Sequence, residues 1–208
     1  MNRRDFLKTG TLSMITLAAL TMGCSTQTPA ATQAAEPISK EGASQPMNIT
    51  DKKILIAYFS WSGNTRAVAE TIHTRIGGDI YEIVPETPYS QNYQAVVDKA
   101  EQEQKANARP AIKNRLTDIS QYDVIFVGYP NWWGSLPMPV ATFMEGCSWQ
   151  GKTVVPFFTH GGGGVQNCDR DLRKLAAGAN VTEYLCLSGN RARNSQSEID
   201  AWLQKLPL

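Results

Sequence analysis

Short runs of consecutive apolar residues recur along most of the chain, separated by segments whose apolar residues follow a helical period. A short unbroken apolar run is typical of a strand that is buried on both faces of a parallel sheet. We predict five strands, over residues 53–59, 80–84, 124–129, 154–158 and 181–187. The segments between and after them predict helices over residues 67–76, 93–105, 139–145, 165–177 and 195–206.

Strands and helices alternate from residue 51 to residue 208, which predicts a single α/β domain. Parallel strands need right-handed crossover connections, and these connections place helices on both faces of the sheet. We therefore expect a doubly wound, five-stranded parallel sheet. Ligands of such sheets bind beyond the carboxyl ends of the strands, so the loops that follow the strands are the first place to look for binding residues.

The first 24 residues read as an export signal. Arg3 and Arg4 precede an apolar stretch, residues 11–22, that is too short and too rich in Thr and Ser to span a bilayer. The paired arginines resemble a twin-arginine signal, with Asn2 in place of the usual Ser or Thr. The residues before Cys24 resemble a lipobox whose Leu is displaced by one position, which predicts that Cys24 is lipidated. The alternatives are an ordinary cleaved signal that leaves a free thiol, or a disordered basic N-terminus.

Residues 25–50 are rich in Thr, Gln, Ala, Pro, Ser and Glu and hold almost no large apolar side chain. Such a segment cannot bury enough apolar surface to offset the entropy of ordering, so we predict a disordered linker. Signal and linker together predict export to the bacterial cell envelope, with a lipid anchor holding the protein at the membrane, outside the cytoplasm. Residues 51–208 then form the predicted domain.

The composition excludes several classes of protein. The 208 residues include 20 Lys and Arg against 19 Asp and Glu, and a formal charge of +1 offers no basic surface for nucleic acid. The four cysteines are widely spaced and form no Cys-x-x-Cys pair, which predicts neither a metal site nor a disulfide scaffold. Redox or group-transfer chemistry in this chain therefore calls for a borrowed cofactor.

The loop after the first predicted strand has the composition of a phosphate-binding turn. Short hydroxyl and amide side chains with one glycine let backbone N–H groups converge on a phosphate, and the start of the following helix adds a favourable field. The candidate residues are Ser60, Ser62, Gly63, Asn64, Thr65 and Arg66. Alternatively, Ser62 or Asn64 is simply the N-cap of that helix.

The loops after the third and fourth predicted strands offer an aromatic wall and bare backbone. Two adjacent tryptophans can stack on a flat ligand, although one of them can equally pack into the core. A run of glycines lets backbone approach the edge of a ligand, or is simply a flexible loop. The candidates are Pro130, Asn131, Trp132, Trp133 and Gly134 in one loop, and Thr159, His160, Gly161 and Gly162 in the other.

Together the three loops resemble those of the flavodoxin family, most closely the members that pair a Ser-x-Ser-Gly-Asn-Thr loop with Trp-Trp-Gly and Thr-His-Gly-Gly loops. The resemblance covers residues 53–206 and rests on the order and spacing of all three motifs. It implies a strand order of 2-1-3-4-5 and bound FMN. It also implies that the first loop holds the phosphate, with Arg66 as a helper, and that the other two border the isoalloxazine ring.

Two other nucleotide motifs fit less well. Residues 146–153 satisfy the P-loop pattern, with two glycines four residues apart followed by Lys-Thr. A P-loop follows a strand and opens a helix, whereas this segment follows a predicted helix and leads into a predicted strand. A dinucleotide fold is not indicated either, since no Gly-x-Gly-x-x-Gly follows the first strand.

The resemblance implies a redox protein in which FMN supplies the chemistry and the protein tunes it. Flavodoxins that carry single electrons are usually strongly acidic, whereas this chain is nearly neutral, and His160 can present a donor or a positive charge to the ring. Arg191 and Arg193 follow the fifth strand at the same edge of the sheet. We therefore expect electron transfer to a redox partner or reduction of a small acceptor such as a quinone, and whether the protein is an enzyme stays open. The alternative is a non-catalytic, surface-anchored binding module with this fold and no flavin.

Overall fold

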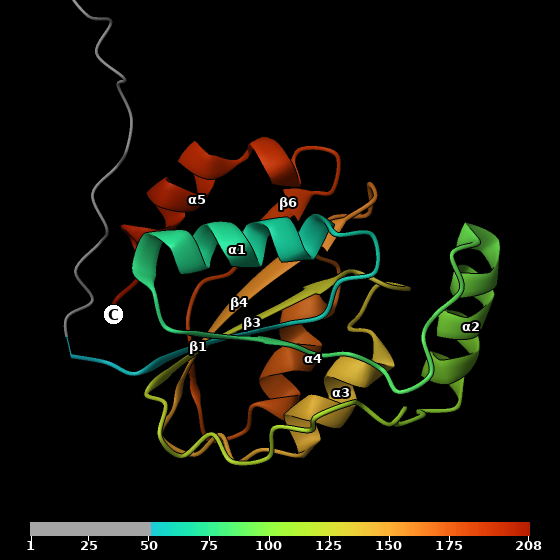
Figure 1. Cartoon of the computed structure of the whole chain (residues 1–208), viewed down its shortest axis with the longest axis horizontal. Coiled ribbons are helices and arrows are strands. Elements are labelled where there is room, and N and C mark those ends of the chain that lie inside the picture. The colour runs from blue at the N-terminus through green and yellow to red at the C-terminus, as the bar shows by residue number, and fades with distance from the viewer. Residues whose placement is uncertain (1–50) are drawn as a thin grey trace, which may run out of the picture. The chain divides into compact units, whose positions relative to one another are not determined.

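The computed structural model describes residues 51–208, and Figure 1 shows their course along the chain. The predicted signal peptide (1–24) with Cys24, and the predicted linker (25–50), lie outside the described residues. Within residues 51–208, no helix is both long enough and apolar enough to cross a membrane.

The strands form one parallel sheet. They are β1 (Ile54–Tyr58), β2 (Asp79–Glu82), β3 (Val124–Pro130), β4 (Thr153–His160), β5 (Asn180–Val181) and β6 (Leu185–Ser188). Their order is β2-β1-β3-β4-β5, with β6 also paired to β4, and every pairing is parallel. The predicted fold class and the strand order that the resemblance implies are therefore confirmed.

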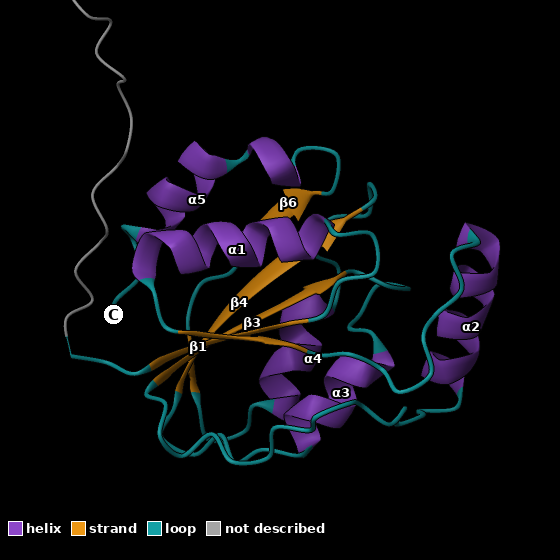
Figure 2. Ribbon diagram, in the orientation of Figure 1, coloured by secondary structure: helices purple, strands orange, loops and turns teal. Residues whose placement is uncertain are grey.

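Helices cover both faces of the sheet (Figures 1 and 2). One face carries α1 (Asn64–Ile76), the 3-10 turn η1 (Ala192–Asn194) and α5 (Gln196–Leu203), whose apolar residues form one cluster with the sheet. The other face carries α3 (Met138–Glu145) and α4 (Cys168–Leu175), whose apolar residues belong to a second cluster. Successive residues of β1 and β3 alternate between the two clusters, because neighbouring side chains of a strand point to opposite faces.

The remaining helix, α2 (Tyr93–Lys105), begins and ends as predicted but stands clear of the sheet (Figure 2). Its residues Val96 and Ala100 are buried, yet neither belongs to the two clusters that pack on the strands. The segment after α2 covers the sheet instead, with Ile112, Ile119 and Tyr122 packed into the cluster on the α3 side. As a result, α2 lies at the carboxyl edge of the strands, beside the loops that follow them.

The fifth predicted strand, residues 181–187, is broken in two, which corrects the sequence-based prediction. Val154 accepts a hydrogen bond from the N–H of Thr182, so the even-numbered residues of β4 present their backbone groups to the last strand. Pro156 is one of these and has no N–H to donate, so the hydrogen-bond ladder stops there. Between Val154 and β6 the last strand also holds one residue more than β4, as in a β-bulge. The Arg173 guanidinium of α4 donates to both Val181 and Thr182 carbonyls, at 2.9 and 2.8 Å, and so satisfies the detached backbone.

The P-loop-like segment, residues 146–153, lies between α3 and β4. It therefore follows a helix and enters a strand, as the sequence indicated, and its residues do not line the cavity described below.

Candidate functional site

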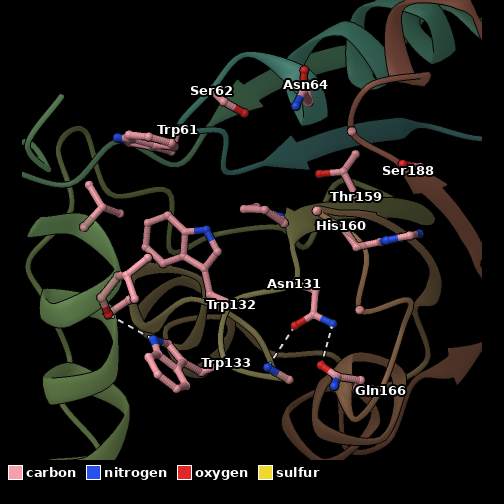
Figure 3. A pocket seen from close by; sticks show the side chains of 18 of the residues that line it. Trp61, Ser62, Asn64, Asn131, Trp132, Trp133, Thr159, His160, Gln166 and Ser188 are labelled. Atoms are coloured by element: carbon pink, nitrogen blue, oxygen red, sulfur yellow. Dashed lines mark hydrogen bonds between the residues drawn. The ribbon is translucent and has the colours of Figure 1, made fainter. Parts of the chain in front are cut away.

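A cavity of about 880 Å³ lies where the carboxyl ends of β1, β3, β4 and β6 meet, with α2 as its outer wall (Figure 3). In parallel sheets these strand ends share one edge, so loops distant in sequence converge there. Its size falls within the range of small-molecule and cofactor sites. No Asp, Glu, Lys or Arg of residues 51–208 lines this cavity.

One end of the cavity is the start of α1. Gly63 precedes the helix with a φ of 82°, a left-handed conformation that favours glycine, and no side chain caps the helix. The N-cap role considered for Ser62 or Asn64 is therefore not observed, and both residues line the cavity instead. The first backbone N–H groups of a helix have no partner within the helix, so they stay available to an anion.

Ser60, Thr65 and Arg66 belong to the same loop but do not line the cavity. The Ser60 hydroxyl is buried and has no hydrogen-bond partner within residues 51–208. The Thr65 hydroxyl lies 2.8 Å from the hydroxyl of Thr159, and this buried pair ties the start of α1 to the end of β4. Arg66 points toward β2, where its guanidinium forms an ion pair with Glu82 at 2.5 Å. Arg66 is therefore engaged with Glu82 and does not line the cavity, and the helper role that the resemblance implied stays a prediction.

The Trp-Trp-Gly loop is a tight two-residue turn. Trp132 and Ser135 exchange backbone hydrogen bonds at 3.0 Å, while Trp133 and Gly134 both have positive φ, 52° and 78°. This is the pattern of a type I′ turn, in which both central residues are left-handed. A left-handed conformation is unfavourable for a residue as bulky as tryptophan, by about 1 kcal/mol or more. Surrounding contacts must therefore hold this turn.

Asn131 supplies most of these contacts (Figure 3). Its Oδ1 accepts from the Gly134 N–H at 2.9 Å, and its Nδ2 donates to the Gly164 carbonyl at 2.7 Å and to Gln166 Oε1 at 3.0 Å. One amide side chain thus joins the turn after β3 to the loop after β4. A backbone hydrogen bond from Asn167 to the Gly134 carbonyl, at 2.9 Å, adds to this connection.

The two tryptophans have different surroundings. Trp132 is partly buried and contacts Phe59 and Tyr89 edge-on, at centroid distances of 5.2 and 5.0 Å. Trp133 is 50% exposed, and its indole N–H donates to the Val97 carbonyl of α2 at 2.9 Å. Trp132 is therefore anchored by packing, whereas Trp133 is exposed. The sequence left open which surroundings each tryptophan has.

Tyr89 and α2 reinforce this aromatic end. Burial and the neighbouring Glu103 carboxylate raise the pKa of Tyr89 far above its usual value, so its hydroxyl stays protonated and donates to Glu103 at 2.5 Å. Beside them, the Trp61 indole N–H donates to the Ser90 carbonyl, and its ring lies 6.2 Å from that of Tyr93. Aromatic rings from three segments thus surround this end of the cavity.

His160 lies across the cavity from Trp132, and its side chain extends away from the tryptophan (Figure 3). Its Nδ1 accepts a hydrogen bond from the Gly162 N–H at 3.0 Å. Because Nδ1 is the acceptor, the ring carries its proton on Nε2 and offers one N–H donor.

Most of the predicted candidates line the cavity: Ser62, Asn64, Pro130, Asn131, Trp132, Trp133, Gly134, Thr159, His160 and Gly161. The other candidates do not line it: Ser60, Gly63, Thr65, Arg66 and Gly162. The structure thus brings the three loops together, and their binding of a cofactor stays a prediction.

Two parts of the cavity wall were not predicted from the sequence. One is the inner face of α2, which contributes Tyr93, Val96, Val97 and Ala100. The other is the loop after β6, which contributes Ser188, Gly189 and Asn190. Gly189 approaches α1 so closely that a Cβ atom there would lie 2.7 Å from Asn64 Nδ2. A Ser-Gly-Asn sequence after the last buried strand was the available signal for this fourth loop. Trp61, Gly163, Gln166 and Asn167 complete the lining.

The doubly wound sheet, with its cavity at the carboxyl edge between the start of α1 and an aromatic wall, defines the class of flavodoxin-like α/β proteins. The chain belongs to the flavodoxin family, since residues 53–206 match the family model described as flavodoxin. The resemblance of the three loops to this family is therefore confirmed.

Several solved structures are similar to this chain. A candidate flavoprotein from Bacteroides eggerthii is 38% identical, with a TM-score of 0.67, over 76% of this chain and 99% of that one. One from Bacteroides uniformis is 30% identical, with a TM-score of 0.66, over 74% and 99%. A flavoprotein from Lactobacillus acidophilus, solved in complex with FMN, is 28% identical, with a TM-score of 0.57, over 73% and 99%. A comparison with curated protein sequences gave no match.

Replacing Asn131 tests whether its amide holds the tryptophan turn. Asn131→Ala removes three hydrogen bonds and leaves the Gly134 N–H without its partner, so we expect the free energy of unfolding to fall by about 1–3 kcal/mol. Urea unfolding measures this loss, and near-ultraviolet circular dichroism reports the tryptophan environment. Asn190→Ala is the control, because Asn190 is exposed in the same cavity and, among the described residues, its side chain bonds only Ser188. We expect a change within about 0.5 kcal/mol. Equal effects of the two substitutions would contradict this role of Asn131.

Proposed function

We propose that this protein binds FMN and works as a redox protein, passing electrons to a partner or to a small acceptor such as a quinone. The observation that carries the proposal is that the two ends of the cavity differ, with an uncapped helix start at one end and aromatic rings at the other. The two ends of FMN differ in the matching way, with a phosphate at one end and a flat ring system at the other. The similar Lactobacillus acidophilus flavoprotein, solved with FMN, supports the assignment.

The residues at the helix end fit a phosphate. Backbone N–H groups of the first turn of α1 are free of a side-chain cap, and no acidic residue lies in that turn. The buried Ser60 hydroxyl has no partner among the described residues, although a buried hydroxyl normally has one. The absence of carboxylates from the described lining of the cavity removes the repulsion that a phosphate would otherwise meet.

The aromatic end fits a flat apolar ring. Trp132 is fixed by its edge-on contacts with Phe59 and Tyr89, so it offers a wall that needs little reordering when a ligand binds. Trp133 and Tyr93 expose 50% and 70% of their surface at the rim, where water leaves on binding. Bound FMN would supply the redox chemistry, and the protein would orient it and control access of water.

The wall formed by α2 favours a small apolar acceptor as one partner. Val96, Val97 and Ala100 present an apolar surface to the cavity beside Tyr93. A quinone is planar and largely apolar, so it suits a wall of this kind. The non-catalytic binding module is the less favoured alternative, because it gives no reason for an uncapped helix start and an unpartnered Ser60 hydroxyl.

The proposal includes the predicted location of the protein. Arg3 and Arg4 would direct export through the twin-arginine route, which carries folded proteins and so suits a chain that is loaded with its cofactor before export. Lipidation of Cys24 would then hold the domain at the membrane through the segment 25–50.

Titration of the flavin-free full-length chain with FMN tests the proposal. We expect one FMN per chain and quenching of tryptophan fluorescence, because the ring would lie against the tryptophans. Trp133→Ala should weaken binding by about tenfold, the effect of losing one stacking partner, and Trp133→Tyr should restore most of it. Tyr184→Ala is the control, since Tyr184 is exposed but does not line the cavity. A full-length chain that binds no FMN would leave the binding module as the better proposal.

His160→Ala should lower the midpoint potential of the bound FMN. His160 lines the cavity and its ring offers an N–H donor, and a donor close to the ligand stabilises the more electron-rich, reduced form. Spectroelectrochemical titration of the loaded chain measures the potential. His73→Ala serves as the control, since His73 is the only other histidine and lies on α1 away from the cavity. An unchanged midpoint potential would mean that His160 only holds the loop at Gly162 and does not act on the flavin.

Substitutions in the predicted signal test the location. Replacing both Arg3 and Arg4 by Lys should keep the protein in the cytoplasm, because the twin-arginine route depends on the paired arginines. Cys24→Ser should instead release the exported domain from the membrane fraction into the soluble fraction. Immunoblots of fractionated cells report both outcomes, and a Cys24→Ser protein that stays with the membrane would exclude lipid anchoring at this cysteine.

A further inference from the structure

Arg193 places a guanidinium directly over the start of α1. A Cβ atom at Gly63 would lie 3.0 Å from Nη2 of Arg193, so the charged group lies against the turn that opens the helix. Arg193 forms no ion pair with any carboxylate of residues 51–208. Its neighbour Arg191 does, with Glu198 at 3.2 Å. The two arginines after β6 thus differ in whether a carboxylate neutralises them.

The backbone that carries Arg193 is held firmly. Ala192 is 1% exposed and packs into the apolar cluster that α1 shares with the sheet. The Arg191 carbonyl accepts from the Asn194 N–H at 2.8 Å and from the buried Ser195 hydroxyl at 2.9 Å. The close approach of Gly189 to Asn64 fixes the same loop against α1 from the other side. The packing of η1 therefore sets the backbone position of Arg193, and from there its exposed side chain reaches Gly63.

This position is electrostatically unfavourable in the absence of an anion. The N-terminus of a helix carries a partial positive charge, and a guanidinium beside it is repelled. No acidic residue in the first turn of α1 offsets this, and no carboxylate among the described residues lines the adjacent cavity. A bound phosphate dianion would convert both repelled charges into favourable partners.

We propose that Arg193 recognises the phosphate of the bound flavin and makes the site selective for FMN over riboflavin, which lacks the phosphate. The inference rests on the proposed function and extends it to the loop after β6. Backbone N–H groups favour any acceptor at the start of α1, whereas the full charge of Arg193 favours only the anionic one. Arg193 therefore sets the preference for the phosphorylated ligand, and Ser62 and Asn64 shape the site around it.

Flavin titrations of four full-length chains test this assignment: the wild type, Arg193→Gln, Arg193→Lys and Arg191→Gln. Tryptophan fluorescence gives the dissociation constants of FMN and of riboflavin at low and high salt. We expect Arg193→Gln to weaken FMN binding by about 10-fold to 100-fold, as for the loss of a charged hydrogen bond, and to leave riboflavin binding unchanged. Arg193→Lys keeps the charge and should recover part of the affinity. Arg191→Gln should match the wild type.

Two further readouts separate recognition from a structural role. The salt dependence of FMN binding should weaken in Arg193→Gln, because ions screen the lost attraction. The thermal stability of the flavin-free Arg193→Gln chain should equal or exceed that of the wild type, since a repulsion is removed. A structural role predicts the reverse: lower stability of the flavin-free chain and equal losses of FMN and riboflavin binding.

The proposal is overturned if Arg193→Gln keeps the wild-type ratio of FMN to riboflavin affinity. It is also overturned if Arg191→Gln lowers this ratio as strongly, because the effect would then reflect net charge rather than position. Failure of the proposed function has a different signature, since the wild-type chain would then bind neither flavin.

Discussion

Parallel pairing of β1, β3 and β4 is the constraint on which the rest of this molecule depends. Because these strands run in one direction, the loops that follow them meet at one edge, and β6 adds a fourth loop there through its pairing with β4. Both faces of the sheet are buried under helices or under the segment after α2, so this edge is where the strand ends open to a ligand. The cavity follows from the topology, and the loop residues decide its chemistry.

Charged groups at the start of α1 are arranged differently from those on the rest of the domain surface. The domain pairs many of its surface charges, as in Arg75 with Asp200 between α1 and α5, and Arg109 with Glu145 near α3. At the start of α1, by contrast, the helix end is uncapped, Arg193 forms no ion pair within residues 51–208, and no carboxylate lies in the described lining of the cavity. The proposed anionic ligand gives a physical reason for leaving positive charge unneutralised beside an open cavity, since such charge adds nothing to folding.

The sequence predicted the parts of this fold that depend on local pattern. Unbroken apolar runs located the buried strands, and the family's three loops appeared at three of the strand ends that meet at the cavity. The errors have long-range causes. Pro156 breaks the last strand only because its nitrogen faces that strand and not β3, and this depends on the register of the sheet. The position of α2 could not be predicted from the sequence either. Val96 and Ala100 show the spacing of any packed helix, whether they face a sheet or a cavity.

The position of α2 also explains why a strained tryptophan is kept at the rim. Trp133 adopts a left-handed backbone, and in that conformation its indole N–H reaches the Val97 carbonyl of α2. Tyr89 binds Glu103 of the same helix, and Trp132 packs against Tyr89. Since α2 contributes to neither apolar cluster on the sheet, these contacts around the aromatic end hold much of the helix in place. Trp132 and Trp133, which line the cavity, thus also take part in attaching α2 to the domain, so the strain at Trp133 is offset by contacts that the rest of the fold does not provide.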